Sequence, residues 1–238
     1  MSLESIPIKL FADGADLAGI LEYYKKPYIS GLTTNPTLMR KAGIDDYEKF
    51  SCRVLEVVRD KPVSLEVFSD EFSDMRRQAL KLSSLAGNVY VKIPVTNSLG
   101  ECSSGLVRDL SAQGVKVNVT AVLTERQVAT MACALDPRTP SVISVFAGRI
   151  ADCGVDPEPV FAFARNELAG LPHCELLWAS VREVFNIHQA ARSGAQIVTV
   201  THDILAKAIK HSGIPLDRMS LETVKMFRDD AIKAGYSL

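Results

Sequence analysis

The strongest constraint on the fold of this chain is the regular recurrence of short aliphatic segments along it. Eight such segments start 20 to 35 residues apart, and each has the length and composition of one buried β-strand. They occupy residues 8–12, 29–33, 63–68, 89–95, 115–121, 142–146, 176–181 and 197–201. Amphipathic stretches separate them. In the first gap, Asp16 is a candidate helix N-cap before apolar residues at positions 17, 20, 21 and 24.

Strands that alternate with helices pair in parallel, so the pattern predicts an α/β fold. Eight such units within 238 residues predict a single-domain (β/α)8 TIM barrel over residues 1–238. The alternative is a doubly wound open sheet, which usually carries a glycine-rich phosphate loop, and the sequence contains none. Residues 220–238 exceed what the eighth unit needs. They predict an extra C-terminal helix that packs on the barrel or on a neighbouring subunit.

Composition and charge argue against several classes of protein. A net charge of −1 disfavours a nucleic-acid partner, and the absence of an apolar run of about 18 residues disfavours a membrane span. The first ten residues lack the apolar core of a signal peptide. The five cysteines form no Cys-x-x-Cys pair, and the four histidines have no metal-binding spacing. We therefore expect a cytoplasmic protein with no metal and no cofactor.

Alternation within each strand separates residues that face the helices from residues that face the barrel interior. In residues 89–95 every odd position is aliphatic, which places Lys92 in the interior. The interior positions assigned in this way are Glu66, Lys92, Asn118, Thr120, Trp178, Ser180 and Arg182, while Leu177, Ala179 and Val181 are assigned to the outside. Most of the polar ones lie toward the carboxyl ends of their strands, where the active sites of such barrels are found.

Lys92 carries the clearest chemical signal. A lysine amine that is shielded from water is more readily neutral, and it can then attack a carbonyl and form a Schiff base. The alternative is an edge-strand lysine whose ammonium group lies in water. Glu66, if it faces inward, needs a partner such as Lys92.

Three further charged residues follow strands. Asp13 ends the first strand and fits either a general acid–base at the barrel mouth or an Asx turn or helix cap. Arg149 and Arg182 follow the sixth and seventh strands, where planar guanidinium groups suit a phosphate. Surface salt bridges are the alternative for both arginines.

Six short motifs of this sequence resemble those of the transaldolase family, and they occur in the family's order. They are FAD at 11–13, GLTTNPT at 31–37, VKIPVT at 91–96, VNVT at 117–120, SVFAGR at 144–149 and ASVR at 179–182. The resemblance extends over residues 8 to 230. The family fold is a (β/α)8 barrel with a Schiff-base lysine on its fourth strand, which agrees with the strand count made from the sequence alone.

The resemblance implies a role for each residue of the motifs. Lys92 would be the Schiff-base nucleophile, and Asp13 would move protons during carbon–carbon cleavage. Glu66 and Thr120 would hold a water that shuttles protons. Four residues are implied to hydrogen-bond the dihydroxyacetone part of the sugar, namely Thr33, Asn35, Asn118 and Ser144. Three are implied to bind its phosphate, namely Arg149, Ser180 and Arg182. Phe146 is a further inner position of the substrate site.

By this resemblance, the reaction is transfer of a dihydroxyacetone unit from fructose 6-phosphate or sedoheptulose 7-phosphate to an aldose phosphate. Similar short proteins are fructose-6-phosphate aldolases, which release free dihydroxyacetone and have glutamine and tyrosine at the positions of Glu66 and Phe146. Both residues here are of the transaldolase type, so transfer is favoured. An aldolase and an inactive barrel that binds sugar phosphates are the alternatives.

The sequence also departs from the family. Gly14 and Ala15 stand where the family usually has Thr or Ser, and Trp178 stands where a small residue is usual. We expect these residues to flank the barrel mouth and to affect the choice of acceptor. Family members form dimers, pentamers or decamers, so the resemblance implies a homo-oligomer. The pentose phosphate route and a specialised sugar pathway both remain open.

Overall fold

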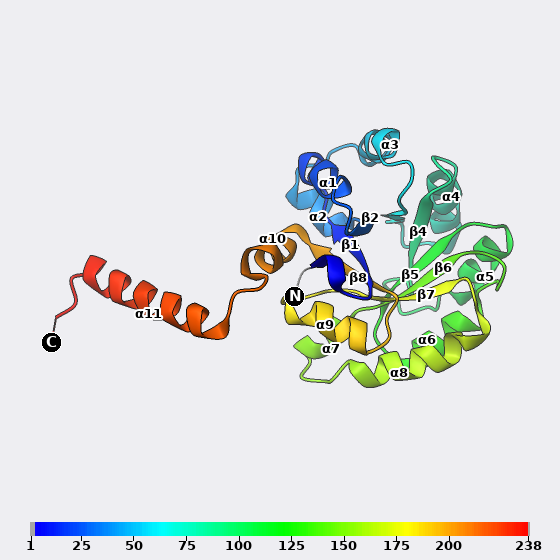
Figure 1. Cartoon of the computed structure of the whole chain (residues 1–238). Coiled ribbons are helices and arrows are strands. Elements are labelled where there is room, and N and C mark those ends of the chain that lie inside the picture. The colour runs from blue at the N-terminus through cyan, green and yellow to red at the C-terminus, as the bar shows by residue number, and fades with distance from the viewer. Residues whose placement is uncertain (1–2, 238) are drawn as a thin grey trace.

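Eight parallel strands close into a barrel in chain order within the part of the chain that the structure describes, residues 3–237 (Figure 1). The structure is a computed structural model, and residues 1, 2 and 238 of the expected domain lie outside the described part. The strands are β1 (Lys9–Asp13), β2 (Ile29–Thr33), β3 (Val63–Glu66), β4 (Val89–Pro94), β5 (Val117–Val122), β6 (Ser141–Val145), β7 (Cys174–Trp178) and β8 (Ile197–Thr201). The predicted (β/α)8 barrel is therefore confirmed.

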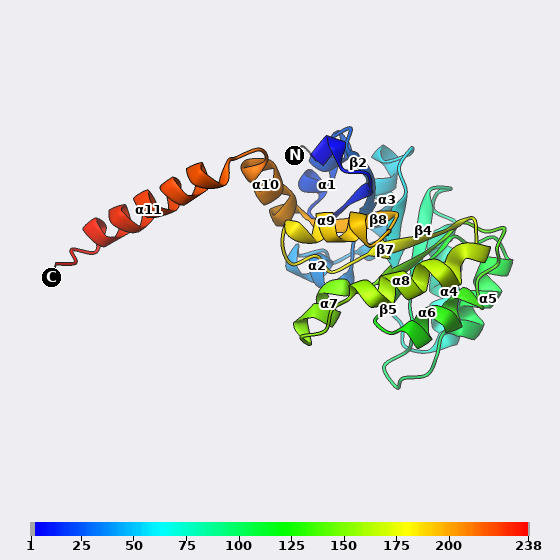
Figure 2. The same cartoon turned by 60° about the horizontal axis from the view of Figure 1, so that its bottom comes forward.

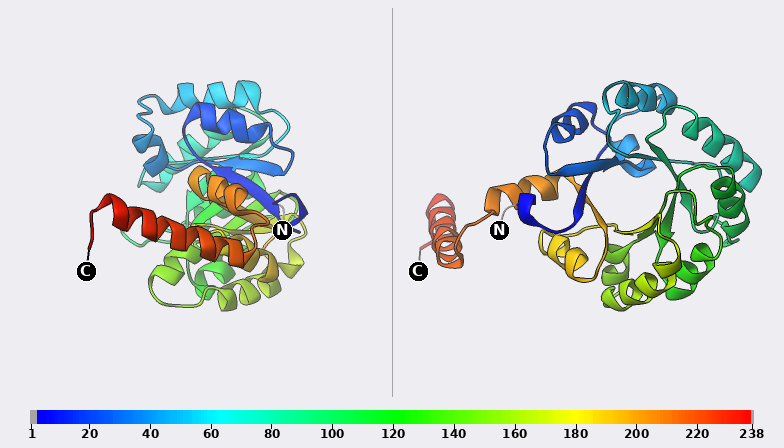
Figure 3. Two further views of the ribbon diagram at one scale, coloured as in Figure 1. Left: turned by 60° about the vertical axis from the view of Figure 1, so that its left-hand side comes forward. Right: turned by 45° about the vertical axis from the view of Figure 1, so that its right-hand side comes forward.

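Helices surround this barrel on all sides, as the right-hand view of Figure 3 shows. They are α1 (Leu17–Tyr24), α2 (Pro36–Lys41), α3 (Tyr47–Val57), α4 (Phe72–Ser83), α5 (Ser104–Ala112), α6 (Glu125–Ala132), α7 (Ala147–Asp152), α8 (Glu158–Glu167), α9 (Phe185–Arg192), α10 (His202–His211) and α11 (Leu216–Lys233), with short 3-10 helices at Leu3–Ser5 and Leu168–Gly170. Asp16 caps α1 as predicted, because its carboxylate accepts a hydrogen bond from the Gly19 N–H. None of the described helices is both long and apolar enough to cross a membrane.

Two apolar clusters hold the barrel together. The larger lies between strands and helices, and it contains the alternate residues of β4 that were predicted to face outward, such as Val91 and Ile93. The smaller fills the barrel interior and contains Phe11 and Leu177. Phe11 packs so closely against β2 that a Cβ on Gly31 would lie 2.5 Å from its ring. Because apolar side chains fill the interior, the polar residues lie at the carboxyl ends of the strands.

The prediction of which β7 side chains face the barrel interior was wrong. Trp178 points to the helices and stacks on Phe161 of α8, with ring centroids 4.6 Å apart, while Leu177 and Ala179 belong to the interior cluster. Ser180 adopts a φ of +67°, which breaks the strand alternation after Trp178. The prediction continued a single alternation through this bend, which put Trp178 and Ser180 on one face and so inverted the facing of the β7 residues. Trp178 does not flank the barrel mouth.

The C-terminal helix α11 lies earlier in the chain than predicted, since it begins at Leu216 rather than at residue 220 and ends at Lys233. It extends away from the barrel after α10 (Figures 1 and 2), and none of its residues is buried. Its expected contact with a neighbouring subunit stays a prediction.

Candidate active site

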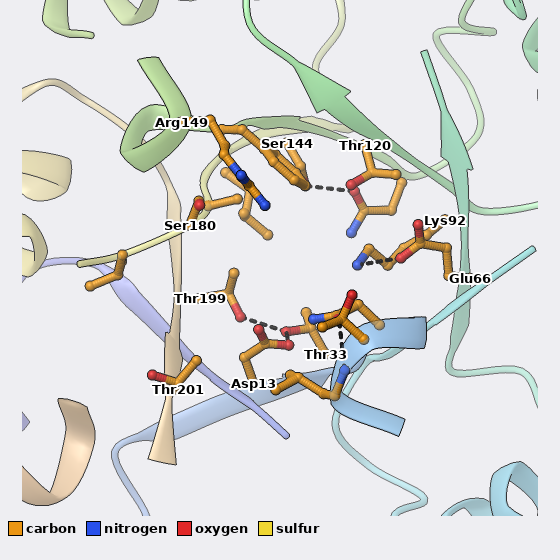
Figure 4. A pocket seen from close by; sticks show the side chains of 18 of the residues that line it. Asp13, Thr33, Glu66, Lys92, Thr120, Ser144, Arg149, Ser180, Thr199 and Thr201 are labelled. Atoms are coloured by element: carbon orange, nitrogen blue, oxygen red, sulfur yellow. Dashed lines mark hydrogen bonds and ion pairs between the residues drawn. The ribbon is translucent and has the colours of Figure 1, made fainter. Parts of the chain in front are cut away.

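A cavity of about 440 Å³ opens at the carboxyl ends of the strands (Figure 4). Its volume is in the range of small-molecule sites. The sequence-predicted residues that line it are Asp13, Thr33, Asn35, Glu66, Lys92, Asn118, Thr120, Ser144, Phe146, Arg149, Ser180 and Arg182. The structure therefore brings all the predicted site residues into one cavity. The roles that the resemblance assigns to them stay predictions.

Lys92 and Glu66 form an ion pair at the floor of this cavity. The register of β3 and β4 places the two residues side by side, and Lys92 Nζ lies 2.9 Å from Glu66 Oε2. Nζ also donates a hydrogen bond to the Thr34 carbonyl at 3.0 Å. Lys92 is only 7% exposed, so it is not the water-exposed edge lysine that was the alternative. The pair gives the amine an acceptor for its proton within hydrogen-bond distance.

Tyr47, at the start of α3, holds the Glu66 backbone. Its hydroxyl donates to the Glu66 carbonyl at 2.8 Å and accepts from the Glu66 N–H at 2.7 Å. Burial raises the pKa of Tyr47 far above its ordinary value, so the phenol stays protonated. Sequence reasoning missed Tyr47, which lies on a helix far from any motif.

Asp13, at the end of β1, lines the same cavity (Figure 4). Burial raises the pKa of its carboxyl, and the nearby Lys92 charge and a 2.8 Å hydrogen bond from Thr33 oppose this rise. Asp16, and not Asp13, caps the helix that follows. A carboxyl whose pKa is raised toward neutrality suits proton transfer.

Neutral polar groups from β5 and β6 form another part of the cavity wall. Ser144 donates to Asn118 Oδ1 at 2.6 Å, and Asn118 Nδ2 donates to Ser64 at 3.1 Å. These bonds fix the Asn118 amide so that its second Nδ2 proton remains for a ligand. The Thr120 hydroxyl is buried and has no hydrogen-bond partner among residues 3–237. A buried hydroxyl left without a partner is a place for a bound water or substrate oxygen.

The two arginines at the mouth differ in their surroundings. Arg182 donates from Nε and Nη2 to the two carboxylate oxygens of Asp152 on α7, at 3.1 and 2.6 Å. The Arg182 guanidinium also holds the pKa of the Asp152 carboxyl below its ordinary value. The salt-bridge alternative thus describes Arg182, although the residue still lines the cavity. Arg149, also on α7, extends into the cavity (Figure 4).

Glycines allow two close approaches around the mouth. A Cβ on Gly148 would lie 1.7 Å from the Ser180 carbonyl oxygen, so α7 can reach the β7 end only with glycine there. A Cβ on Gly14 would lie 2.5 Å from the His202 ring, which packs against the Tyr23 ring in a tilted arrangement with centroids 4.6 Å apart. His202 therefore occupies the space that a Thr or Ser at position 14 would need.

Sequence reasoning also missed two residues of β8. Thr199 and Thr201 line the cavity, and the Thr199 hydroxyl lies 2.5 Å from that of Thr33. The signal was present, because the two threonines alternate with aliphatic residues in 197–201, as Lys92 does in its own strand.

Known proteins are similar to this chain over nearly its whole length. A family model described as transaldolase/fructose-6-phosphate aldolase matches residues 10–237. A protein named "Probable transaldolase" from Thermoanaerobacter sp. (strain X514) is 34% identical, covering 97% of this chain and 100% of the relative. Another of that name, from Bartonella quintana (strain Toulouse), is 33% identical, with 97% and 100% coverage.

A solved structure of a "putative dihydrodipicolinate synthase family protein" from Coccidioides immitis is also similar. It superposes with a TM-score of 0.59 and 13% identity, covering 84% of this chain and 68% of that chain. At that identity the likeness concerns the fold alone.

The backbone contacts of Tyr47 lead to a stability prediction. Tyr47→Phe removes the one hydroxyl that bonds both the N–H and the carbonyl of Glu66, so we expect the free energy of unfolding to fall by about 2 kcal/mol. Urea denaturation measures this change. The matched control is Tyr24→Phe, whose hydroxyl bonds the exposed Asp60, with an expected change within about 0.5 kcal/mol. Equal losses in the two variants would contradict the assigned role of Tyr47.

Proposed function

Because this chain belongs to the transaldolase/fructose-6-phosphate aldolase family, we propose that it is a transaldolase that works through a Schiff base on Lys92. The donor is a ketose phosphate, fructose 6-phosphate or sedoheptulose 7-phosphate, and the acceptor is an aldose phosphate. The observation that carries the proposal is the buried Lys92–Glu66 pair, which shares one cavity with Asp13.

Schiff-base formation begins at the ion pair. Lys92 passes a proton to Glu66, and the neutral amine attacks the C2 carbonyl of the ketose. The resulting carbinolamine loses water to give the iminium ion. A water between Glu66 and the unpartnered Thr120 hydroxyl is suited to carry the protons of this dehydration and of the later hydrolysis.

Cleavage of the C3–C4 bond needs a base at the C4 hydroxyl. Asp13 takes that proton, the bond breaks, and its electron pair moves into the iminium to form an enamine. The aldose phosphate leaves with a new aldehyde at C4. An acceptor aldehyde then enters, the enamine carbon attacks it, and the alkoxide regains a proton from Asp13. Hydrolysis of the new iminium releases the product ketose and restores Lys92.

Transfer, rather than release of free dihydroxyacetone, requires that the enamine is not protonated before the acceptor arrives. Phe146 contributes an apolar ring to the cavity and no proton donor. Asn118, fixed by Ser144 and Ser64, can hold the hydroxyls of the three-carbon unit in place. These features favour a transaldolase over an aldolase. The free thiols of all five cysteines are consistent with the cytoplasm as the proposed setting.

The Schiff base can be trapped directly. Incubation with fructose 6-phosphate and borohydride should add mass irreversibly, and peptide mapping should place the adduct on Lys92. Lys92→Met should abolish the adduct, whereas Lys116→Met, which changes a lysine next to Tyr90 outside the active-site cavity, should retain it. A folded wild-type protein without an adduct would contradict the mechanism.

A coupled assay then separates the alternatives. Transfer requires erythrose 4-phosphate, whereas an aldolase cleaves fructose 6-phosphate without it, and an inactive barrel does neither.

The arginines at the mouth are proposed to bind the substrate phosphate. Arg182→Ala should raise KM for phosphorylated donors about tenfold or more, and it should leave KM for free dihydroxyacetone nearly unchanged. The matched control is Arg192→Ala, which removes another exposed arginine–carboxylate pair, to Glu158, away from the cavity. Equal effects of Arg182→Ala on both donors would remove its phosphate role.

The C-terminal helix is proposed to pack on a second copy of this chain. Leu221, Val224 and Phe227 form an exposed apolar stripe at helical spacing on α11, and their own barrel leaves them uncovered. Light scattering of the full chain should show an oligomer, and Phe227→Asp should weaken it. Lys233→Asp, about 180° around the helix from Val224 at the centre of this stripe, should weaken it much less. A monomeric wild type would overturn this proposal.

A further inference from the structure

The hydrogen bonds of Asp13 extend beyond its nearest neighbour. Thr33 donates its hydroxyl proton to Asp13 Oδ1 at 2.8 Å. A threonine hydroxyl has one proton, so Thr33 has none left for the Thr199 oxygen that lies 2.5 Å away. Thr199 must therefore donate to Thr33. The three side chains form a directed chain that runs from β8 through β2 to β1.

We propose that Thr199 is a positioning residue that acts through Thr33 to hold the Asp13 carboxylate in its ionised, correctly oriented form. The catalytic role of Thr199 rests on the proposed function, in which Asp13 is the base. This hydrogen-bond chain also changes what Thr33 can do. The family resemblance implies that Thr33 hydrogen-bonds the sugar, and with its proton committed to Asp13, Thr33 can do so only as an acceptor.

The charges around Asp13 explain why such a chain is needed. Among the described residues, the charged groups that act on Asp13 are Lys92 from β4 and Glu66 from β3. The Lys92 ammonium is already paired with Glu66 at 2.9 Å, so it only partly offsets the negative charge of Asp13. Burial and Glu66 both raise the pKa of Asp13. Donated hydrogen bonds are then the remaining means of keeping the carboxylate ionised.

Burial makes this chain of hydrogen bonds rigid and cooperative. Thr33 is 4% exposed and Thr199 is 8% exposed, so water competes little for either hydroxyl. A hydroxyl that accepts a hydrogen bond becomes a stronger donor, and the Thr199 bond thereby strengthens the Thr33 bond to Asp13. The register of β1 with β8 places Thr199 beside Phe11, two residues before Asp13. The backbone thus fixes the distance that the chain spans.

The test is Thr199→Val, which keeps the shape of the side chain and removes its hydroxyl. We expect kcat to fall about tenfold with little change in KM, because Asp13 acts in bond cleavage and not in binding. The acid limb of the pH–rate profile should move to higher pH, since a lost donor makes the carboxylate more basic. Thr199→Ser should restore both. The matched control is Thr139→Val, which removes an equally buried hydroxyl that donates to the Ser111 carbonyl outside the cavity.

A second measurement does not depend on turnover. In protein labelled with ¹³C at aspartate carboxyls, the Asp13 signal, assigned by its loss in Asp13→Asn, should titrate at higher pH in Thr199→Val than in the wild type or Thr139→Val. An unmoved titration would overturn the proposal, as would a raised KM with an unchanged pH profile, which would make Thr199 a substrate contact. If borohydride traps no adduct while the titration moves, the proposed function fails and the hydrogen-bond chain stands.

Discussion

The ion pair between Lys92 and Glu66 is the interaction on which the rest of the site depends. Two charges withdrawn from water are tolerated only with good geometry and further hydrogen bonds. The register of β3 and β4 supplies the geometry. The further hydrogen bonds come from the Thr34 carbonyl, which accepts from Lys92, and from Tyr47, which bonds the Glu66 backbone. The polar groups around the pair therefore stabilise a buried charge, and in the proposed mechanism they also prepare an amine for attack on a carbonyl.

Much of this arrangement could be predicted because a parallel barrel has few degrees of freedom. Once the strands are in order, their carboxyl ends must converge, so residues that alternate inward, such as Lys92 and Asn118, share one cavity. Tyr47 could not be found in this way, because a helix residue that bonds a distant backbone has no periodic signal. The facing of Trp178 could not be found either, since the positive φ of Ser180 breaks the alternation on which the prediction relied.

The positive charge at the cavity mouth is smaller than the presence of two arginines suggests. Arg182 is held by Asp152, so the local field is close to that of one arginine, Arg149, rather than two. A substrate phosphate would find a guanidinium already oriented by a carboxylate but partly neutralised by it. Such a site would hold a phosphate in a fixed position and release it readily, which suits an enzyme whose donor and acceptor must exchange at one site.

The contact between Gly14 and the His202 ring limits the order in which this sequence can change. A larger residue at position 14 meets a ring that Tyr23 holds in place, so it is tolerated only after His202 has become smaller. If His202 becomes smaller first, the change opens a void beside Asp13, and this destabilises the protein less than a clash at position 14. Variation at the two positions is thus coupled, and the less destabilising path between the two states passes through the form with two small residues.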